Sequence, residues 1–176
     1  MHHRLDGEVA VVTGAGTGIG AAIASRLAAM GASVAITGRR AALLEERAQA
    51  ITSAGGTVLA VPGDSATEPG VEELFRRVDD GFGPVSILVN NAAIAGPVAP
   101  IWEQDFAGWE ETLRINLSGP WLCSRAAARR MMAQRKGRIV NIGSISGKRP
   151  LARRSPYTTA KLGLVGLTRT LALELG

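Results

Sequence analysis

The chain has 176 residues, enough for one domain with a sizeable core, and 46% of them are hydrophobic, 20% are charged and 22 are glycine. Its formal charge of +5 is spread in short groups of lysine and arginine, and only 4% of its residues are aromatic and could stack on bases, which argues against a nucleic-acid interface. The start of the chain lacks the apolar run of a secretory signal and no segment is long enough to span a membrane, so we expect a soluble, cytoplasmic protein.

In chain order, apolar runs typical of strands alternate with longer segments that have helical spacing. Residues 9–13 form a β-branched run that leads into a glycine turn, and residues 19–30 carry apolar side chains three or four positions apart. Next come an expected strand at 33–37, a helix at 41–54, a strand at 57–61 and a helix from 67 to about 80. The sequence Thr67-Glu68-Pro69 is typical of a helix start, with a cap residue, an acid and a proline in the first turn.

The second half of the chain continues this alternation. Residues 85–90 are apolar throughout, as in a strand that is covered on both faces. Residues 105–134 predict a long helical region, which the glycine-proline pair at 119–120 bends rather than ends. A fifth strand is expected at 138–144 and a last helix at 156–175.

Strands that alternate with helices predict a parallel sheet with helices on both faces. The chain has no internal repeat, low-complexity stretch or linker, so residues 1–176 are expected to form a single domain. The fold class is therefore α/β, a doubly wound parallel sheet of the Rossmann type. Ligands of such folds bind beyond the carboxyl ends of the strands, and each motif described below falls at one of those ends.

A glycine-rich turn joins the first expected strand to the first helix. Its glycines let the backbone approach a ligand closely, and the N–H groups at the start of the helix suit a pyrophosphate. Such turns also serve plain strand-to-helix packing, but the position between strand and helix favours dinucleotide binding. The cofactor contacts predicted here are Gly14, Thr17, Gly18, Ile19 and Gly20.

The end of the second expected strand bears on the choice of cofactor. NAD-selective sites carry an acid about 20 residues after the glycine turn, whereas this strand ends in Arg39 and Arg40 with no carboxylate in reach. The arginines either bind a 2′-phosphate or are a solvated pair at a helix start, and the missing acid favours NADP(H), with NAD(H) as the alternative. Past the third strand, Asp64 and Ser65 are further candidates, and Asp64 either accepts from the adenine amino group or is a turn residue.

Tyr157 and Lys161 are four residues apart at the start of the last expected helix, so their side chains share one face. Ser155 is expected to be the N-cap of this helix and Pro156 its first residue. An ammonium about 4 Å from the phenol, at an effective dielectric of about 20, would stabilise the phenolate by roughly 4 kcal/mol. Tyr157, the only tyrosine, is therefore the predicted general acid and base, and Ser144 at the end of a strand is the predicted donor to the substrate oxygen.

Together these residues resemble the short-chain dehydrogenase/reductase family. The resemblance implies an NAD(P)-dependent oxidoreductase that interconverts an alcohol and a ketone or aldehyde by hydride transfer. It implies that Tyr157 exchanges the proton, that Ser144 orients the carbonyl, and that Lys161 holds the nicotinamide ribose. The matching positions, in the family's order, are Thr13-Gly14, Gly18-Ile19-Gly20, Asn90-Asn91-Ala92, Asn116, Ser144, Tyr157 and Lys161.

The resemblance also gives roles to asparagines that alone would indicate only a turn and a helix kink. It implies that Asn116 holds a water that links Lys161 to solvent, and that Asn91, Ala92 and Ala93 line the cofactor groove. Ala93 stands where the family usually has glycine, so its methyl group is expected to narrow the groove. Relatives continue with another strand, a substrate-covering loop and helix, and a final strand, so we expect a truncated fold whose fifth strand is a sheet edge.

The remaining signals leave alternatives open. Cys123 has no disulfide partner and is expected to be a small buried side chain, while His2 and His3 precede the first strand, so no metal site is predicted. Four loop cations either favour an acidic substrate or are solvated: Lys148, Arg149, Arg153 and Arg154. Three tryptophans are expected to be core residues or subunit contacts: Trp102, Trp109 and Trp121.

Partners and competing functions follow from the same features. The last two helices have ample apolar surface and such helices pair subunits in relatives, so the resemblance implies a homo-oligomer, a dimer or tetramer, that acts on a small alcohol or carbonyl substrate. A dinucleotide-binding protein without turnover is the first alternative, since the relatives' last segment is not represented. A basic module for nucleic acid or acidic partners is the second, weaker alternative.

Overall fold

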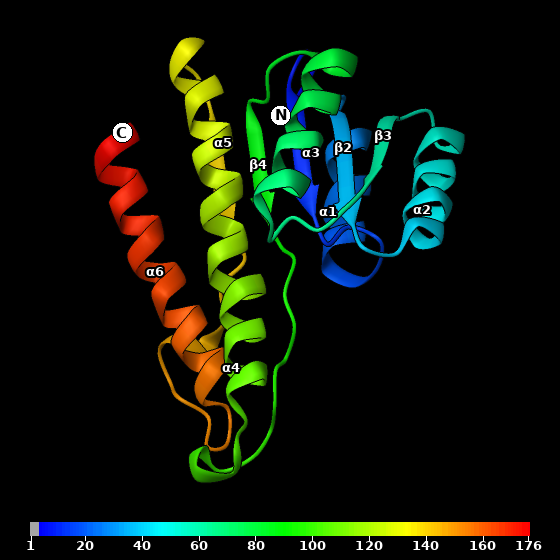
Figure 1. Ribbon diagram of the computed structural model, residues 1–176. Coiled ribbons are helices and arrows are strands. Elements are labelled where there is room, and N and C mark those ends of the chain that lie inside the picture. Colours follow the sequence, from blue (N-terminus) through cyan, green and yellow to red (C-terminus); the bar gives the residue numbers. More distant parts are fainter. Residues whose placement is uncertain (1–3) are drawn as a thin grey trace.

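The computed structural model describes residues 4–176, so His2 and His3 lie outside the described residues. The described residues form a five-stranded parallel sheet in the order β3-β2-β1-β4-β5. Its strands are β1 (Val9–Thr13), β2 (Ser33–Gly38), β3 (Thr57–Pro62), β4 (Ile87–Asn90) and β5 (Arg138–Asn141). Helices follow the strands as the alternation predicts, which confirms the doubly wound α/β fold (Figure 1).

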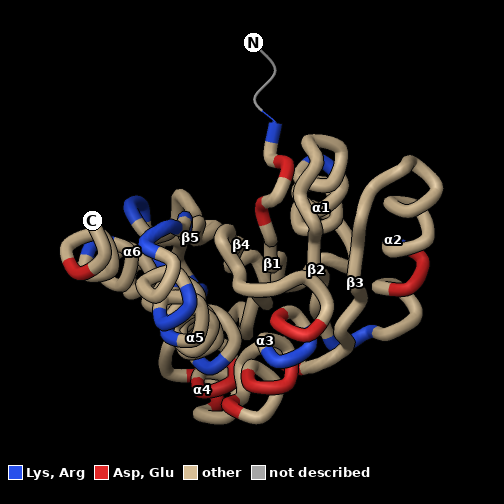
Figure 2. The backbone as a smooth tube through the Cα atoms, turned by 90° about the horizontal axis from the view of Figure 1, so that it is seen from above, with Lys and Arg blue, Asp and Glu red and all other residues tan. Residues whose placement is uncertain are grey.

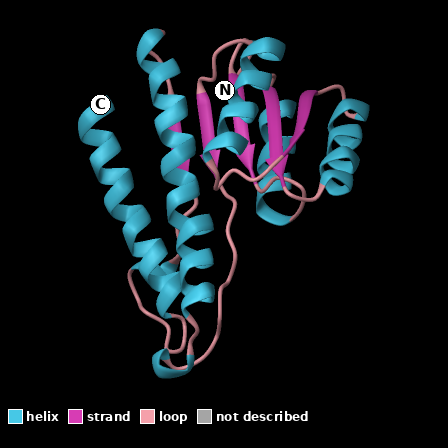
Figure 3. Ribbon diagram, viewed as in Figure 1, coloured by secondary structure: helices cyan, strands magenta, loops and turns pink. Residues whose placement is uncertain are grey.

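The helices account for most of the remaining chain (Figure 3). They are α1 (Gly18–Ala29), α2 (Ala41–Ser53), α3 (Glu68–Phe82), α4 (Phe106–Leu113), α5 (Gly119–Ala133) and α6 (Ser155–Leu175), with 3₁₀ turns at Ile101–Glu103 and Ile145–Gly147. Thr67 caps α3 as predicted, because its hydroxyl accepts a hydrogen bond of 3.2 Å from the N–H of Gly70. Within residues 4–176, no helix combines the length and apolar character needed to cross a bilayer.

Alternate side chains of β1 enter two separate apolar clusters, one on each face of the sheet. Val9 and Val11 join the cluster beneath α3 and α5, whereas Ala10 and Val12 join the cluster beneath α1 and α2. Figure 2 shows α1 on one side of the sheet and α3 and α5 on the other. Cys123 is buried in the first cluster, as predicted, and burial raises the pKa of its thiol to about 12.

Three expected elements differ in detail from the structure, and the first is the fourth strand, which begins at Ile87 rather than at 85. The helical region runs through Gly119 as predicted, but five residues of π-helix, Arg114–Ser118, join α4 to α5. A π turn just before Pro120 fits the missing N–H of proline, which cannot donate to the preceding turn. The fifth strand ends at Asn141 rather than at 144, because its neighbour β4 ends at Asn90.

One side-chain prediction is wrong, and one of two alternatives is excluded for a second. Ser155 is not the N-cap of α6 but its first residue, and its hydroxyl donates to Gln104 Oε1 at 2.7 Å instead of to the helix backbone. Trp102 and Trp121 are 81% and 47% exposed, so neither is a core residue, and the alternative of a subunit contact stays a prediction for them. The expected sheet edge is present, since β5 pairs with β4 alone among the described residues.

Candidate functional site

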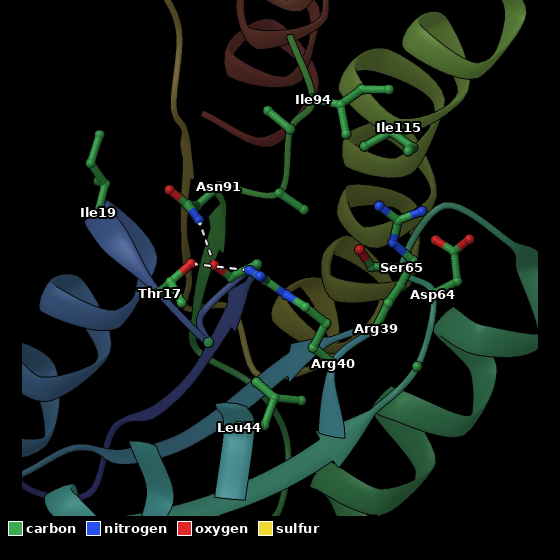
Figure 4. Close-up of a pocket in the computed structure, with 16 residues that line it drawn as sticks. Thr17, Ile19, Arg39, Arg40, Leu44, Asp64, Ser65, Asn91, Ile94 and Ile115 are labelled. Atoms are coloured by element: carbon green, nitrogen blue, oxygen red, sulfur yellow. Dashed lines mark hydrogen bonds between the residues drawn. The ribbon is translucent and has the colours of Figure 1, made fainter. Parts of the chain in front are cut away.

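A groove of about 480 Å³ lies beyond the carboxyl ends of the strands (Figure 4). It brings together predicted cofactor residues from four segments: Gly14, Thr17, Ile19, Arg39, Arg40, Asp64, Ser65, Asn91, Ala92 and Ala93. Its wall also holds residues that the sequence did not single out: Gly38, Leu44, Gly63, Ile94 and Ile115. Gly38 ends β2 and Gly63 directly follows β3, so their positions at strand ends could have indicated that they line the groove. The three apolar residues carry no such signal in the sequence.

The glycine turn is held in place by contacts that a side chain would disrupt. Gly14 has a φ of +64°, and a Cβ there would lie 2.8 Å from the Cα of Ala92. A Cβ on Gly20 would lie 2.6 Å from the carbonyl oxygen of Gly14 and would overlap the side chain of Asn91. Gly18 and Gly20 do not line the groove themselves, and Gly20 is buried against Gly14 of the turn.

Asn91, which directly follows β4, holds the turn in place through hydrogen bonds. Its side-chain amide donates to the carbonyls of Thr13 at 2.9 Å and of Gly14 at 3.1 Å. In return, the Thr13 hydroxyl accepts from the backbone N–H groups of Asn91 and Ala92, both at 3.0 Å. Asn91 therefore lines the groove as predicted, but its amide shapes the turn.

The first turn of α1 suits an anionic ligand. The helix begins at Gly18 without a side-chain cap from Thr17 and without an acidic residue in its first turn. Its first N–H groups thus have no partner within the helix and lie at the positive end of the helix dipole. This arrangement fits the pyrophosphate of a dinucleotide.

The two predicted arginines point to different sides of the groove (Figure 4). Arg40 donates to the hydroxyl of Thr17 at 3.2 Å and so reaches across to the glycine turn. Arg39 extends toward α4, where its guanidinium lies 3.9 Å from the carboxylate of Glu111. Both cations are exposed and are available to a phosphate on the ribose.

Asp64 lies on the wall opposite the glycine turn. Its carboxylate accepts from the N–H of Ala66 at 2.9 Å, as a turn residue does, and pairs with Arg114 at 2.9 Å. Burial alone would raise the pKa of Asp64, but the hydrogen bond from Ala66 and the guanidinium of Arg114 outweigh it and hold the pKa below its usual value. The group is therefore an anionic acceptor at the groove.

Tyr157 and Lys161 share one face of α6, as their spacing predicts. The amine of Lys161 lies 5.8 Å from the centre of the Tyr157 ring and donates to the carbonyl of Ile142 at 2.7 Å. Lys161 is buried, and burial lowers the pKa of its ammonium. The carbonyl just beyond β5 therefore fixes the amine beside the tyrosine ring.

Ser144 follows the end of β5 and begins the 3₁₀ turn Ile145–Gly147. Its hydroxyl oxygen accepts from the N–H of Ser146 at 3.1 Å. A hydroxyl that accepts in this way keeps its own proton for donation, so Ser144 can donate to a substrate oxygen.

Asn116 has a contact that the sequence did not indicate. It is fully buried in the π-helix, its Oδ1 accepts from the N–H of Ile94 at 2.8 Å, and its Nδ2 donates to the carbonyl of Ile94 at 2.8 Å. The side chain thus anchors the loop after β4 to the long helix. Irregular π turns of this kind are frequent at functional sites.

The four predicted catalytic residues lie outside the groove lining, and in the described part of the chain Asn116 alone of the four has a side-chain hydrogen bond to a lining residue. Asn116 binds Ile94, and Ile94 is a lining residue. Lys161 binds the segment that leads from β5 to Ser144. Within residues 4–176, no group of three or more His, Cys, Asp or Glu is placed to hold a metal ion.

Comparison with known proteins gives one consistent family. A family model for short chain dehydrogenases matches residues 8–176. A cis-4-hydroxycyclohexanecarboxylate dehydrogenase of Sinomonas cyclohexanicum is 44% identical over 165 residues, which cover 94% of this chain and 66% of the relative. An uncharacterised oxidoreductase of Thermotoga maritima is 40% identical over 171 residues, or 97% of this chain and 66% of the relative.

A solved structure of this family is also similar to this chain. A metagenomic short-chain oxidoreductase in complex with NADP superposes with a TM-score of 0.93 at 38% identity, and the match covers 97% of this chain and 77% of that one. The chain spans 66% of the length of the two curated relatives above.

Proposed function

The chain belongs to the short-chain dehydrogenase family, and from this premise we propose that it is an NAD(P)-dependent oxidoreductase that interconverts an alcohol and a ketone or aldehyde. One observation carries the proposal: the glycine-lined groove and the Tyr157–Lys161 pair lie at the same carboxyl edge of one parallel sheet. Ligands of doubly wound sheets bind at this edge.

Four residues have defined roles in the proposed reduction. The phenol of Tyr157 gives its proton to the carbonyl oxygen of the substrate, while the hydroxyl of Ser144 donates a hydrogen bond to the same oxygen. The ammonium of Lys161 holds the nicotinamide ribose and stabilises the phenolate that remains. Asn116 positions the loop between the groove and the catalytic residues. A bound nicotinamide supplies the hydride, and oxidation of the alcohol reverses every transfer.

NADP(H) is the proposed cofactor. Two guanidinium groups, Arg39 and Arg40, lie at the end of β2, and Gly38 offers no carboxylate to a ribose 2′-hydroxyl. The metagenomic relative bound to NADP supports the same preference.

The test separates binding from turnover. Titration of nicotinamide fluorescence should show tighter binding of NADPH than of NADH, and a panel of ketones and aldehydes should be reduced. Tyr157→Phe should lower kcat by about 10²–10⁴-fold with NADPH affinity nearly unchanged, because only the proton transfer is lost. Thr159→Ala, an exposed change on the same helix, is the matched control. Equal turnover by Tyr157→Phe and wild type would contradict the mechanism.

A dinucleotide-binding protein without turnover is the second candidate. It is favoured by the hydrogen bond of the Lys161 amine to the carbonyl of Ile142 rather than to the phenol of Tyr157. Tight NADPH binding with no reduction of any carbonyl in the panel would support it over the enzyme.

A further inference from the structure

A row of side chains with alternating charge runs along one wall of the groove, from the end of β2 to the loop after β3. The guanidinium of Arg39 lies 3.9 Å from the carboxylate of Glu111 on α4. Glu111 binds Arg114 through two hydrogen bonds of 2.6 and 2.9 Å. Arg114 in turn pairs with Asp64 at 2.9 Å. Two of these four charged residues, Arg39 and Asp64, line the groove directly.

The ion pairs in this row of charges differ in strength. The two-point contact between Glu111 and Arg114 is the geometry in which guanidinium and carboxylate bind best. The hydrogen bond from Arg114 also holds the pKa of Glu111 below its usual value, so Glu111 is charged at neutral pH. The contact with Arg39 is longer and joins side chains that are 59% and 40% exposed. Arg39 is therefore the residue of this row whose ion pair a ligand can replace.

Arg40 differs from Arg39 in its partner. It donates to the neutral hydroxyl of Thr17, so no anion competes for its charge there. A phosphate that binds between the two arginines would meet one cation without an anionic partner and one cation already held by a carboxylate.

We propose that Glu111 is a specificity-determining residue that competes with the 2′-phosphate of the cofactor for Arg39, and so limits the preference for NADP(H) over NAD(H). This inference rests on the proposed function, since it assigns Arg39 to the ribose phosphate. The two-point contact with Arg114 fixes the Glu111 carboxylate beside the groove, where it acts on Arg39 without a contact to the cofactor itself.

The competition can be measured with two adenine nucleotides that lack the nicotinamide half. 2′,5′-ADP and 5′-AMP differ only by the 2′-phosphate. The ratio of the Kd of 5′-AMP to the Kd of 2′,5′-ADP therefore isolates the contribution of that group, and a higher ratio means a stronger preference for the 2′-phosphate. Changes in Arg114 or Asp64 that alter adenine binding affect both nucleotides and cancel in the ratio. Isothermal titration calorimetry on the whole chain gives both constants without any assay of activity.

Glu111→Gln should increase the preference for 2′,5′-ADP by about 3–10-fold at low ionic strength, because the competing charge is removed while the glutamine amide can still accept from Arg114. Glu110→Gln removes the same charge from an exposed neighbour on α4 and should change the ratio by less than about two-fold. Arg39→Gln should lower the ratio, and adding Glu111→Gln to it should have no further effect.

Each other outcome decides against the inference. A ratio that is unchanged or lower in Glu111→Gln would show that Glu111 does not compete for Arg39 or instead prepares it for the phosphate. An increase that persists in the Arg39→Gln background would show that Glu111 acts without Arg39. If wild type binds neither nucleotide, the proposed function itself is wrong; if it binds both and only the variants fail to respond, the proposed function stands and this inference falls.

Discussion

The groove and the β5 edge of this sheet are held in place by different kinds of contact. β1 and β2 are almost entirely buried, and the turn between β1 and α1 fits against its neighbours without room for a side chain. Among the described residues β5 pairs with β4 alone, and its Val140 is 46% exposed. The residues around it are fixed by single polar links, such as that of Lys161 to Ile142.

This difference predicts opposite sensitivities in the two regions. A densely packed backbone tolerates loss of a surface group but not an added atom, because moving its neighbours apart costs free energy. A region fixed by hydrogen bonds is sensitive to the loss of one donor or acceptor, since the partner then remains unsatisfied.

The largest effect is expected for an added methyl group at Gly20. Gly20→Ala should destabilise the protein by about 3 kcal/mol in urea unfolding, because the new Cβ would lie 2.6 Å from the carbonyl oxygen of Gly14. NADPH affinity should fall with it, since the turn must shift.

Gly166→Ala is the matched control, because Gly166 is also helical but a Cβ there meets nothing within 4 Å. It should leave stability unchanged or raise it by about 0.5–1 kcal/mol. Equal effects of the two substitutions would refute the view that packing sets the shape of the groove.

A somewhat smaller effect is expected for the loss of polar atoms at Asn116. Asn116→Ala removes both partners of the Ile94 backbone and should cost about 2 kcal/mol in the free energy of unfolding. Hydrogen exchange at the N–H of Ile94 should quicken, which a general loss of packing would not do selectively. Ser118→Ala, an exposed change in the same π-helix, should be nearly neutral, and protection of Ile94 equal to wild type in Asn116→Ala would contradict the assignment.

The smallest effect is expected at Glu8, which precedes β1 and contacts residues that precede β4 and β5. Ser86 donates to the Glu8 carboxylate at 2.5 Å, and Lys136, just before β5, pairs with the same group. Lys136 and Ser86 hold the pKa of Glu8 below its ordinary 4.5. The stability that Glu8 contributes is therefore present above about pH 4.5 and is lost as the pH falls through the lower folded-state pKa.

Glu8→Gln should thus cost about 1 kcal/mol in urea unfolding at pH 7, and the difference from wild type should shrink toward pH 3. Glu72→Gln, an exposed change on α3, serves as the control. A difference that stays constant with pH would mean that the charge of Glu8 is not what stabilises the fold.

Local chemistry was enough to predict the groove but not the links around β5. The β-branched run 9–13, followed by glycines, predicts both a buried strand and a backbone that approaches a ligand, since both properties depend on neighbouring residues. The spacing of Tyr157 and Lys161 likewise fixes a shared helix face.

The remaining features depend on residues distant in sequence. The end of β5 is set by the end of β4, and the hydroxyl of Ser155 binds Gln104 rather than its own helix. Asn116 finds its partner in Ile94, and Arg114 finds Asp64. No local pattern indicates such pairs, because only the packed sheet brings them together.

The buried position of Cys123 makes it an intrinsic probe of breathing motions in the interior. Its thiol is the chain's only one, is 1% exposed, and has a pKa raised to about 12, so almost none of the reactive thiolate exists at neutral pH. An alkylating reagent can reach the sulfur only when the layer between α3 and α5 opens. Because the thiol contacts the carbonyl of Ser65 at 3.6 Å, and Ser65 lines the groove, the rate of alkylation reports on solvent entry directly behind the groove.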